Sequence, residues 1–428
     1  MEILISSVGT TDPISKNRDA ALLHIARTYR PEKIVLVYSE EMLVKKDFVE
    51  KALFSIEGYH PEVMIESTIL KNDEVYLFDK MYEVMGQIIE KYSGTEHQLI
   101  LNLSSGTPQI ISALFALNRI NDYNTQAIQV ATPSKSANKK YEALSSEDEQ
   151  KLFDENEDNQ KNYEDRTIKD EAGKFNQSLI KRYLRNLISS YDYLAAQELV
   201  ARKEYNKLLS KKKLYRLRVI LKDLVSVFKK QTTLFEIREL PILDVEKTAL
   251  NYYLLIEILN KRGQVADVLI KSKSLVEFII EERLKKNYPT LIKYKKKLPK
   301  LNEEHQDFKE ILSYLDREYK KSQNGSDEEK DDYSPTSTLN LISYTKILEF
   351  YNSCPELIES LRVFISLNNE RNKVAHGLSE INTNLVNSKK LSQTIESLRF
   401  ILQDTYNIDD KYFAFYEELN REMLELLR

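Results

Sequence analysis

One short run in this 428-residue sequence is suited to phosphodiester chemistry, Arg371-Asn372-Lys373-Val374-Ala375-His376. An imidazole titrates near neutrality and can move the proton of a ribose 2′-hydroxyl or of a leaving oxygen. A guanidinium can form two hydrogen bonds to a phosphate and balance the charge that builds there. Asn372 precedes His376 by four residues and so shares its helical face, whereas Arg371 lies about 140° away around an ideal helix.

This run also has a purely structural interpretation. A histidine near the end of a helix is stabilised by the helix dipole, and Gly377 directly after His376 is a typical C-cap. A looser arginine–histidine spacing recurs at Arg18 and His24, which we interpret as a chance match on a packed or solvated helix. The run therefore needs support from the rest of the chain.

Two loops rich in small polar residues form a second candidate site. The first is Ser6–Pro13 (SSVGTTDP), and the second is Asn102–Gln109 (NLSSGTPQ). Hydroxyls, a glycine and free backbone N–H groups before a helix can hold a phosphate or a ribose. Helix capping, with Pro108 at the first helical position, is the simpler alternative. The chain has no G-x-G-x-x-G or P-loop motif, which disfavours ordinary dinucleotide cofactors and P-loop ATP hydrolysis.

The elements that must position these loops alternate between strands and helices. Short apolar runs predict strands at Glu2–Val8, Lys33–Tyr38, Val63–Thr68, Gln98–Leu103 and Thr125–Thr132. Helical patterns lie between them at Ile14–Tyr29, Glu40–Ile56, Asp73–Tyr92 and Pro108–Asn121. This alternation predicts a Rossmann-like α/β fold with a parallel sheet covered on both faces. In such sheets ligands bind beyond the carboxyl ends of the strands, where both loops lie.

The remainder of the chain has helical spacing. We predict an α/β domain at 1–140, a helical connector at 141–240 and an all-α domain at 241–428. The polar segment Ser145–Asp170 is expected to be a linker or a solvated helix. Two segments, Tyr288–Pro299 and the turn-rich loop Ser322–Thr338, interrupt the helical pattern.

Composition limits the class of protein. Nine glycines and ten prolines favour many helices, and 42% hydrophobic residues suffice for full cores. A single cysteine, Cys354, excludes a disulfide framework and a multi-cysteine zinc site, and it fits a cytoplasmic protein. No apolar run is long enough to span a bilayer, and the N-terminus lacks the pattern of a signal peptide, so no membrane partner is expected.

The near-neutral net charge of −4 hides an uneven distribution. Residues 141–173 carry 4 basic and 12 acidic side chains, whereas residues 174–230 carry 15 basic and 4 acidic ones. A solvated helix face explains this without any function. A positive surface that attracts a polyanion is the alternative.

Taken together, the chain resembles a known family. A Rossmann-like domain with a Gly-Thr loop after its fourth strand resembles CARF domains, and Arg371–His376 resembles the R-x(4–6)-H motif of HEPN ribonucleases. The order of the two domains is similar to that of the accessory ribonucleases of type III-A CRISPR systems. The resemblance implies a homodimer that a cyclic oligoadenylate activates allosterically to cleave single-stranded RNA without a metal, in antiviral defence. No stable association with the CRISPR effector complex is expected.

The resemblance also assigns residues. The ligand pocket would contain Thr10, Thr11, Asp12, Ser105, Gly106, Thr107 and Gln109, and the nuclease site Arg371, Asn372 and His376. General resemblance favours cyclic hexa-adenylate over cyclic tetra-adenylate. Some CARF domains slowly cleave their own activator, but the loop SSGTPQ lacks the lysine that some relatives carry after Gly-Thr.

The residues themselves support a dimer. Cleavage by 2′-hydroxyl attack needs a base and an acid, and two copies of His376 in one cleft would supply both. The sequence shows no carboxylate cluster of the two-metal type, so neither a metal site nor a cofactor is predicted. Two alternatives remain: a non-enzymatic nucleotide-sensing regulator with a helical interaction domain, and an α/β-domain enzyme that acts on small nucleotides.

Overall fold

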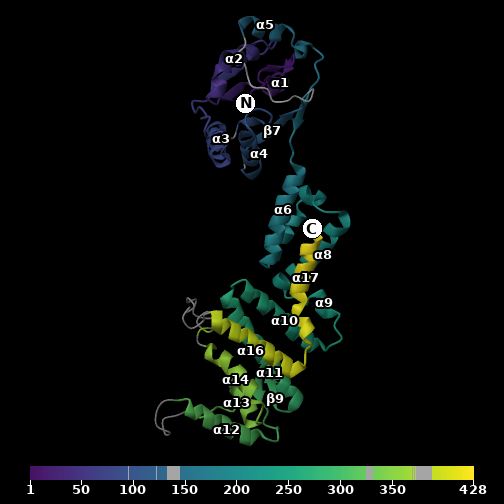
Figure 1. Cartoon of the computed structure of the whole chain (residues 1–428). Coiled ribbons are helices and arrows are strands. Elements are labelled where there is room, and N and C mark those ends of the chain that lie inside the picture. Colours follow the sequence, from purple (N-terminus) through teal and green to yellow (C-terminus); the bar gives the residue numbers. More distant parts are fainter. Residues whose placement is uncertain are drawn as a thin grey trace. The chain divides into compact units, whose positions relative to one another are not determined.

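The computed structural model divides into two compact units, Met1–Asn176 and Gln177–Arg428 (Figure 1). It describes residues 1–94, 96–121, 123–132, 145–323, 331–368, 370, 372 and 388–428, with only the backbone of Glu204 and Ser388. Residues 145–176, which we expected to begin a helical connector, group with the first unit. The domain boundaries drawn from the sequence stay predictions.

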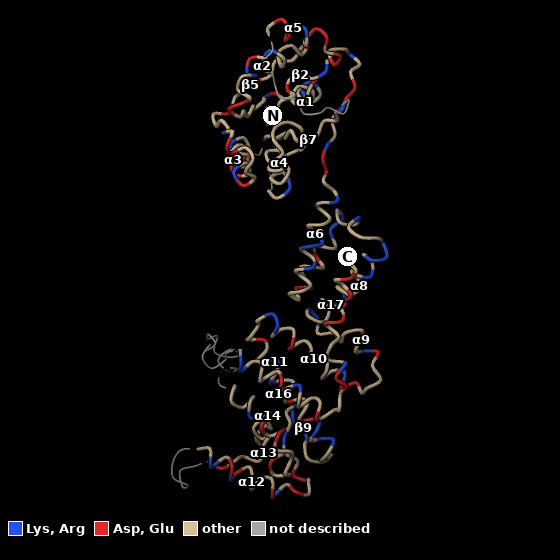
Figure 2. The backbone as a smooth tube through the Cα atoms, in the orientation of Figure 1, with Lys and Arg blue, Asp and Glu red and all other residues tan. Residues whose placement is uncertain are grey.

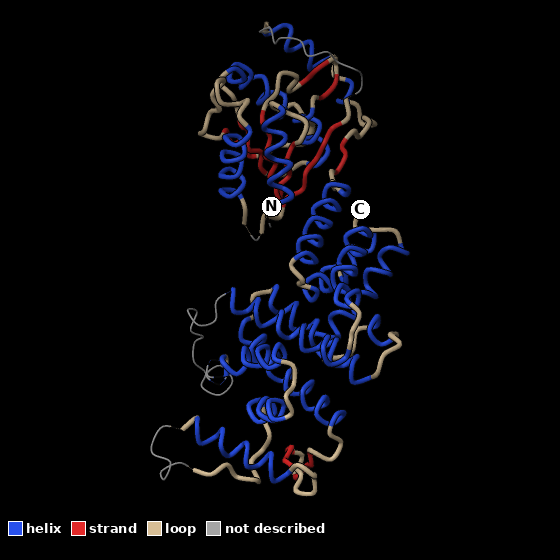
Figure 3. Tube along the Cα trace, turned by 60° about the horizontal axis from the view of Figure 1, so that its bottom comes forward, coloured by secondary structure: helices blue, strands red, loops and turns tan. Residues whose placement is uncertain are grey.

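The first unit is built on a six-stranded sheet in the order β5-β4-β1-β6-β7-β8. Figure 3 shows its strands in red. The strands are β1 (Glu2–Ser7), β4 (Lys33–Val37), β5 (Glu62–Ile65), β6 (Gln98–Asn102), β7 (Thr125–Val130) and β8 (Thr167–Lys169). The first five are parallel, and only β8 pairs antiparallel with its neighbour. Because β1 lies between β4 and β6, the strand order reverses at β1, which is the usual ligand position in such sheets.

Helices cover both faces of this sheet. They are α1 (Ala21–Tyr29), α2 (Lys46–Phe54), α3 (Phe78–Tyr92) and α4 (Pro108–Ile120). Alternate side chains of β1 enter separate cores: Ile3 and Ile5 pack with α3 and α4, whereas Leu4 packs with α1 and α2. The predicted Rossmann-like fold is confirmed.

The helix expected from Ile14 begins only at Ala21. Residues 14–19 instead form a small hairpin, β2 (Ile14–Ser15) and β3 (Arg18–Asp19). Both residues of its turn, Lys16 and Asn17, have φ of 56°, as tight hairpin turns require. The helical pattern of the sequence missed this turn because neither residue is a glycine.

The acidic segment after residue 144 is more ordered than a linker. It forms α5 (Ser146–Asp154) and then returns to the sheet edge as β8. Beyond β8, Asp170 pairs with Arg119 of α4 at 3.3 Å, and Phe175 packs against Phe115 with ring centroids 5.2 Å apart. Composition alone hid this order, because it does not show that the acidic residues have buried basic partners.

The second unit is helical, as predicted. Its helices are α6 (Gly173–Ser189), which begins in the first unit, α7 (Tyr193–Ala201), α8 (Lys211–Lys230), α9 (Phe235–Arg238), α10 (Asp244–Lys261), α11 (Val265–Asn287), α12 (Phe308–Lys321), α13 (Leu341–Phe350), α14 (Pro355–Ser366), α16 (Ser388–Tyr406) and α17 (Phe415–Leu426). The expected interruption at Tyr288–Pro299 contains β9 (Ile292–Lys295), which pairs with β10 (Leu298–Leu301). Part of the loop Ser322–Thr338 lies outside the described residues.

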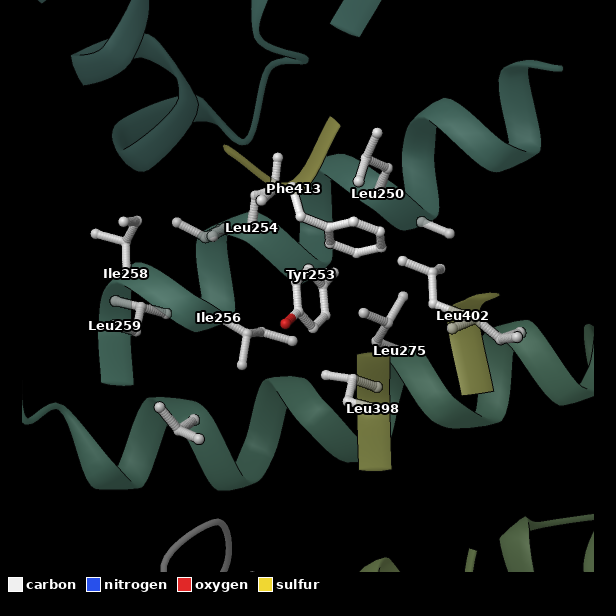
Figure 4. Close-up of a cluster of buried hydrophobic side chains, with 14 of the residues drawn as sticks. Leu250, Tyr253, Leu254, Ile256, Ile258, Leu259, Leu275, Leu398, Leu402 and Phe413 are labelled. Atoms are coloured by element: carbon white, nitrogen blue, oxygen red, sulfur yellow. The ribbon is translucent and has the colours of Figure 1, made fainter. Parts of the chain in front are cut away.

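One core holds this unit together. Figure 4 shows Tyr253 of α10 beside Phe413, with Leu275 and Leu398 from α11 and α16 close by. The Tyr253 and Phe413 rings meet edge to face, with centroids 5.2 Å apart, a favoured aromatic geometry. Among the described residues, no helix is both long and apolar enough to cross a membrane.

Truncation of Leu398 to alanine is expected to lower the free energy of unfolding by about 2–5 kcal/mol, because this fully buried side chain would leave a cavity. Leu243 provides a matched control, since its side chain is 64% exposed and Leu243→Ala should change that energy by under about 0.5 kcal/mol. Chemical denaturation measures both variants. Equal effects would contradict the packing in Figure 4.

Candidate functional sites

The two polar loops predicted from the sequence meet where the sheet reverses. One follows β1 and the other follows β6, its parallel neighbour. The Ser7 hydroxyl donates to the carbonyl oxygen of Ser105 at 2.6 Å. A Cβ at Gly9 would lie 3.0 Å from the amide nitrogen of Gly106, so the two backbones are almost in contact.

Gly106 is required by both its conformation and its surroundings. Its φ of 101° is one that side chains rarely adopt. A Cβ there would stand only 2.1 Å from the Ser7 hydroxyl oxygen. The second loop therefore needs glycine at this position, because any side chain would force the loops apart.

Thr107 begins α4. Its hydroxyl oxygen accepts a hydrogen bond from the Ile110 N–H at 3.4 Å and donates to the Val75 carbonyl at 3.0 Å, and Pro108 follows in the first turn. This is the N-cap role that the sequence left open. The first turn of α4 thus points backbone N–H groups toward the loops, which favours an anion.

The Asp12 side chain stabilises the conformation of the first loop. Its carboxylate accepts hydrogen bonds from the N–H groups of Gly9, at 2.8 Å, and Leu22, at 3.2 Å. Burial raises the pKa of Asp12, although these hydrogen bonds oppose that rise. Both carboxylate oxygens bond to protein, which favours a supporting role over direct ligand contact.

Lys45 is a functional candidate that the sequence analysis missed. Its side chain is 2% exposed, and its ammonium group donates to the carbonyl oxygens of Thr10 and Asp12, each at 2.6 Å. Burial lowers the pKa of Lys45 to about 8, and the neighbouring Asp12 opposes that fall. A buried cation directly behind the first loop adds positive potential where an anion would bind. No local pattern separates Lys45 from the other lysines of its helical segment.

The remaining predicted ligand residues differ in exposure. Thr10 and Thr11 are exposed, Gly106 and Gln109 are half-buried, and Ser105 is buried. Thr11 also lines a cavity of about 450 Å³ at the carboxyl ends of the strands. The other residues around the cavity include Arg18, Ser104, Val130, Thr132 and Arg166. Tyr38, directly after β4, is fully buried.

A buried cluster beside this cavity has ligand types that suit a metal. Asp19, His24 and Asp158 bring their side chains together with almost no exposure. Arg27 pairs with Asp19 at 2.6 Å, however, and Arg166 pairs with Asp158 at 2.6 Å. Two guanidinium groups already balance the two carboxylates, so the cluster suits an internal ion-pair network better than a cation site.

This network attaches the acidic segment to α1. The Arg166 N–H donates to Nε2 of His24 at 2.9 Å. Burial alone would raise the pKa of Asp158, but hydrogen bonds from His24 and the Asp19 N–H, together with Arg166, lower it to about 2. His24 is fully buried, which agrees with the interpretation of Arg18 and His24 as a chance match.

Most of the predicted nuclease run lies outside the described residues. Arg371 and His376 both lie outside the described residues, and their roles stay predictions. Asn372 is helical and exposed, and the nearby Glu370 is buried. The run comes after α14, which ends at Ser366, and the expectation that His376 lies near the end of a helix stays a prediction.

Comparisons with known proteins match both halves. The Cas_Csm6 CARF domain model matches residues 62–167, and the Cas_Csm6 HEPN domain model matches residues 227–424. A CRISPR system endoribonuclease Csm6 from Streptococcus thermophilus is 58% identical over the full length of both chains. The chain belongs to the Csm6 endoribonuclease family.

Other Csm6 proteins support this membership. The endoribonuclease Csm6′ of Streptococcus thermophilus is 35% identical, with both chains fully covered. The structure of Enterococcus italicus Csm6 bound to cyclic hexa-2′-fluoro-hexa-dAMP superimposes with a TM-score of 0.68, at 28% identity and with both chains fully covered. The family and fold inferred from the sequence are confirmed, and so is a ribonuclease with CARF and HEPN domains.

Gly106→Ala is expected to destabilise the first unit by about 3 kcal/mol or more, because the new methyl group overlaps the Ser7 hydroxyl. Gly58→Ala is the matched control. Its φ of 65° lies in the left-handed region that a side chain can adopt at about 1 kcal/mol, and its nearest neighbour is 3.9 Å away, so only that backbone cost is expected. Thermal unfolding compares the two, and equal losses would contradict the close approach of the loops.

The stability of the protein is expected to depend on pH through Lys45. The unfolded chain binds more protons than the folded one between pH 8 and 10.5, because burial lowers the pKa of Lys45 to about 8. The contribution of Lys45 to the free energy of unfolding therefore rises with pH across that window, by up to roughly 3 kcal/mol.

Denaturant titrations at pH 8, 9 and 10.5 test this on Lys45→Met and on Lys46→Met, its exposed neighbour. Relative to the unaltered protein, Lys45→Met should lose this contribution, so the difference in unfolding free energy between the two should change by up to roughly 3 kcal/mol from pH 8 to 10.5. Lys46→Met should follow the unaltered protein at every pH. A difference that stays constant with pH in Lys45→Met would contradict the lowered pKa.

Proposed function

We propose that this chain is a cyclic oligoadenylate-activated, metal-independent endoribonuclease that cleaves single-stranded RNA in type III CRISPR antiviral defence. The observation that carries the proposal is the meeting of two hydroxyl-rich loops at Gly9 and Gly106, in a family whose Enterococcus italicus member binds a cyclic hexa-adenylate analogue. Exposed Thr10 and Thr11, the start of α4 and the buried Lys45 together favour an anionic ligand. The same relative favours the hexa-adenylate ring over the tetra-adenylate ring.

The ligand is expected to contact the protein in two ways. Thr10, Thr11, Ser105, Gly106 and Gln109 offer hydroxyl, amide and backbone groups to ribose and phosphate. Asp12 and Thr107 support the loops from behind, because their side chains already bond to protein atoms. Slow cleavage of the ring at these hydroxyl-rich loops would limit the signal.

RNA cleavage is assigned to the HEPN half. His376 removes the proton from a ribose 2′-hydroxyl, whose oxygen then attacks the adjacent phosphorus. The bond from phosphorus to the 5′-oxygen breaks, and a second His376 protonates that oxygen. Arg371 balances the charge on the phosphate. Asn372 orients the imidazole of His376 or the phosphate. The products are a 2′,3′-cyclic phosphate and a 5′-hydroxyl, and no step requires a metal or another cofactor.

Base and acid are both histidines, so one active site needs two copies of the chain. A cyclic oligoadenylate bound across the paired CARF domains would favour the arrangement in which the Arg371–His376 segments of the two subunits face each other. The helical connector would carry this population shift. The enzyme is expected to act in the cytoplasm as a homodimer, free of the CRISPR effector complex.

A fluorescent single-stranded RNA, incubated with cyclic tri-, tetra- or hexa-adenylate in EDTA, tests the activity. Cleavage should depend on the hexa-adenylate ring and disappear in His376→Ala, which should still bind the ring. Cleavage retained in His376→Ala would contradict the assigned site. Absence of cleavage with every ring would favour a non-enzymatic nucleotide-sensing regulator.

Mixing tests the shared site. With a nine-fold excess of His376→Ala over the unaltered chain, only about one unaltered subunit in ten has an unaltered partner. Activity per unaltered subunit should therefore fall to about a tenth after the subunits have exchanged. Unchanged activity would show that each chain contains a complete site.

A further inference from the structure

A dense basic segment lies in the helical unit outside the sites described above. Residues 285–300 contain seven lysines and no aspartate or glutamate. They include the end of α11, strand β9 and most of β10 (Figure 2). In the basic region 174–230, by contrast, four acidic residues are interspersed. The segment also lies within residues 227–424, which match the HEPN model.

The turn of the β9–β10 hairpin places two lysines in a costly conformation. Lys296 and Lys297 connect the strands, and their φ values are 52° and 66°. A two-residue turn with two positive φ values normally contains Asn-Gly, because other residues lose roughly 1 kcal/mol each in that conformation. Local folding preference therefore does not explain these lysines.

Their charge is not balanced by the rest of the hairpin. Lys293, nearer its base, pairs with Glu303 at 3.3 Å. Lys295, Lys296 and Lys297 are exposed, and none of them forms an ion pair with any residue that the structure describes. Adjacent like charges repel one another. An anion that binds at the tip would reduce this repulsion.

The base of the hairpin is firmly held. Leu301 is buried, and the Asn302 side chain donates to the Thr290 carbonyl at 2.8 Å. The Thr290 hydroxyl lies 2.8 Å from Nδ1 of His305, whose Nε2 lies 3.0 Å from the Tyr351 hydroxyl. A rigid ribbon loses little entropy when it binds.

Tyr294 adds an aromatic surface between the lysines. Its side chain is 51% exposed, its hydroxyl donates to Glu281, and the Lys285 ammonium lies 4.9 Å from the ring centre. Basic groups next to an exposed aromatic ring suit a single-stranded nucleic acid, whose phosphates and bases use both.

We propose that the tip of the β9–β10 hairpin, Lys295 to Lys297, binds the phosphate backbone of the RNA substrate independently of its sequence. This inference rests on the proposed function, because that function supplies the RNA. The hairpin would increase the affinity for RNA without taking part in the bond-breaking step. Its contribution should weaken as salt concentration rises, since each phosphate contact releases a counterion.

The double variant Lys296→Asn/Lys297→Gly removes both charges while giving the turn its preferred residues. The full chain carrying His376→Ala, which blocks cleavage, provides the background for binding a fluorescent 20-nucleotide single-stranded RNA from 50 to 500 mM salt. The slope of log affinity against log salt should become less steep by about 1.4, or 0.7 for each lost phosphate contact. The melting temperature should not fall.

The matched control is Lys229→Gln/Lys230→Gln, two exposed lysines at the end of α8. An unchanged slope in the hairpin variant, or an equal change in the control, would overturn the proposal. If the hairpin tip instead binds an acidic protein, the salt slope for RNA binding would also be unchanged in the hairpin variant, and the proposal would be overturned. A failure of the proposed function can be told apart from a failure of the hairpin proposal. In the first case the unaltered protein would cleave no RNA with any cyclic oligoadenylate.

Discussion

The sensor half depends on the close contact of two backbones. The loops after β1 and β6 approach at Gly9 and Gly106 more tightly than side chains would permit. The hydrogen bond from Ser7 to Ser105 joins them from within. Once the backbones touch, the hydroxyls and N–H groups of both loops gather on one small surface at the point where the strand order reverses.

Buried charges maintain that surface from behind. Asp12 holds the first loop through backbone N–H groups, and Lys45 holds it through backbone carbonyls. The Asp12 carboxylate accepts hydrogen bonds from backbone N–H groups, and the Lys45 ammonium donates to the carbonyl oxygens of the same loop. Their interactions leave Thr10 and Thr11 exposed, which separates residues that shape the loop from residues able to contact a ligand.

The sequence predicted the elements whose signal is local. Apolar runs such as Lys33–Tyr38 identified the parallel strands, and the loop Asn102–Gln109 was predicted as a helix start that Thr107 does cap. It missed features that depend on distant partners. Strand β8 exists because β7 offers an open edge, and its segment is held by Arg166 and Asp158. Lys45 is distinguished only by burial against a loop more than thirty residues away.

The sequence predicted where the candidate sites lie better than it predicted the role of each residue in them. The two sensor loops follow from the strand order, since parallel strands end at the same edge of the sheet. The roles within them do not follow, because a hydroxyl that caps a helix and one that meets a ligand have the same sequence signal. For Arg371 and His376 the spacing and the family support the chemistry, and their assignment stays a prediction. The charge of 285–300 could be counted from the sequence, but only the fold shows that three of its lysines occupy a hairpin tip.

Helix α4 also has a mechanical consequence. Its first residue follows Thr107 in the loop after β6, and further along it carries Phe115 and Arg119, which contact Phe175 in the first turn of α6 and Asp170 just before it. An α-helix is stiff along its axis, so a tilt at the loop end becomes a displacement at the other end, about 20 Å away at 1.5 Å per residue. The same helix that begins at the loop after β6 therefore also contacts the start of α6, the helix that continues into the second unit.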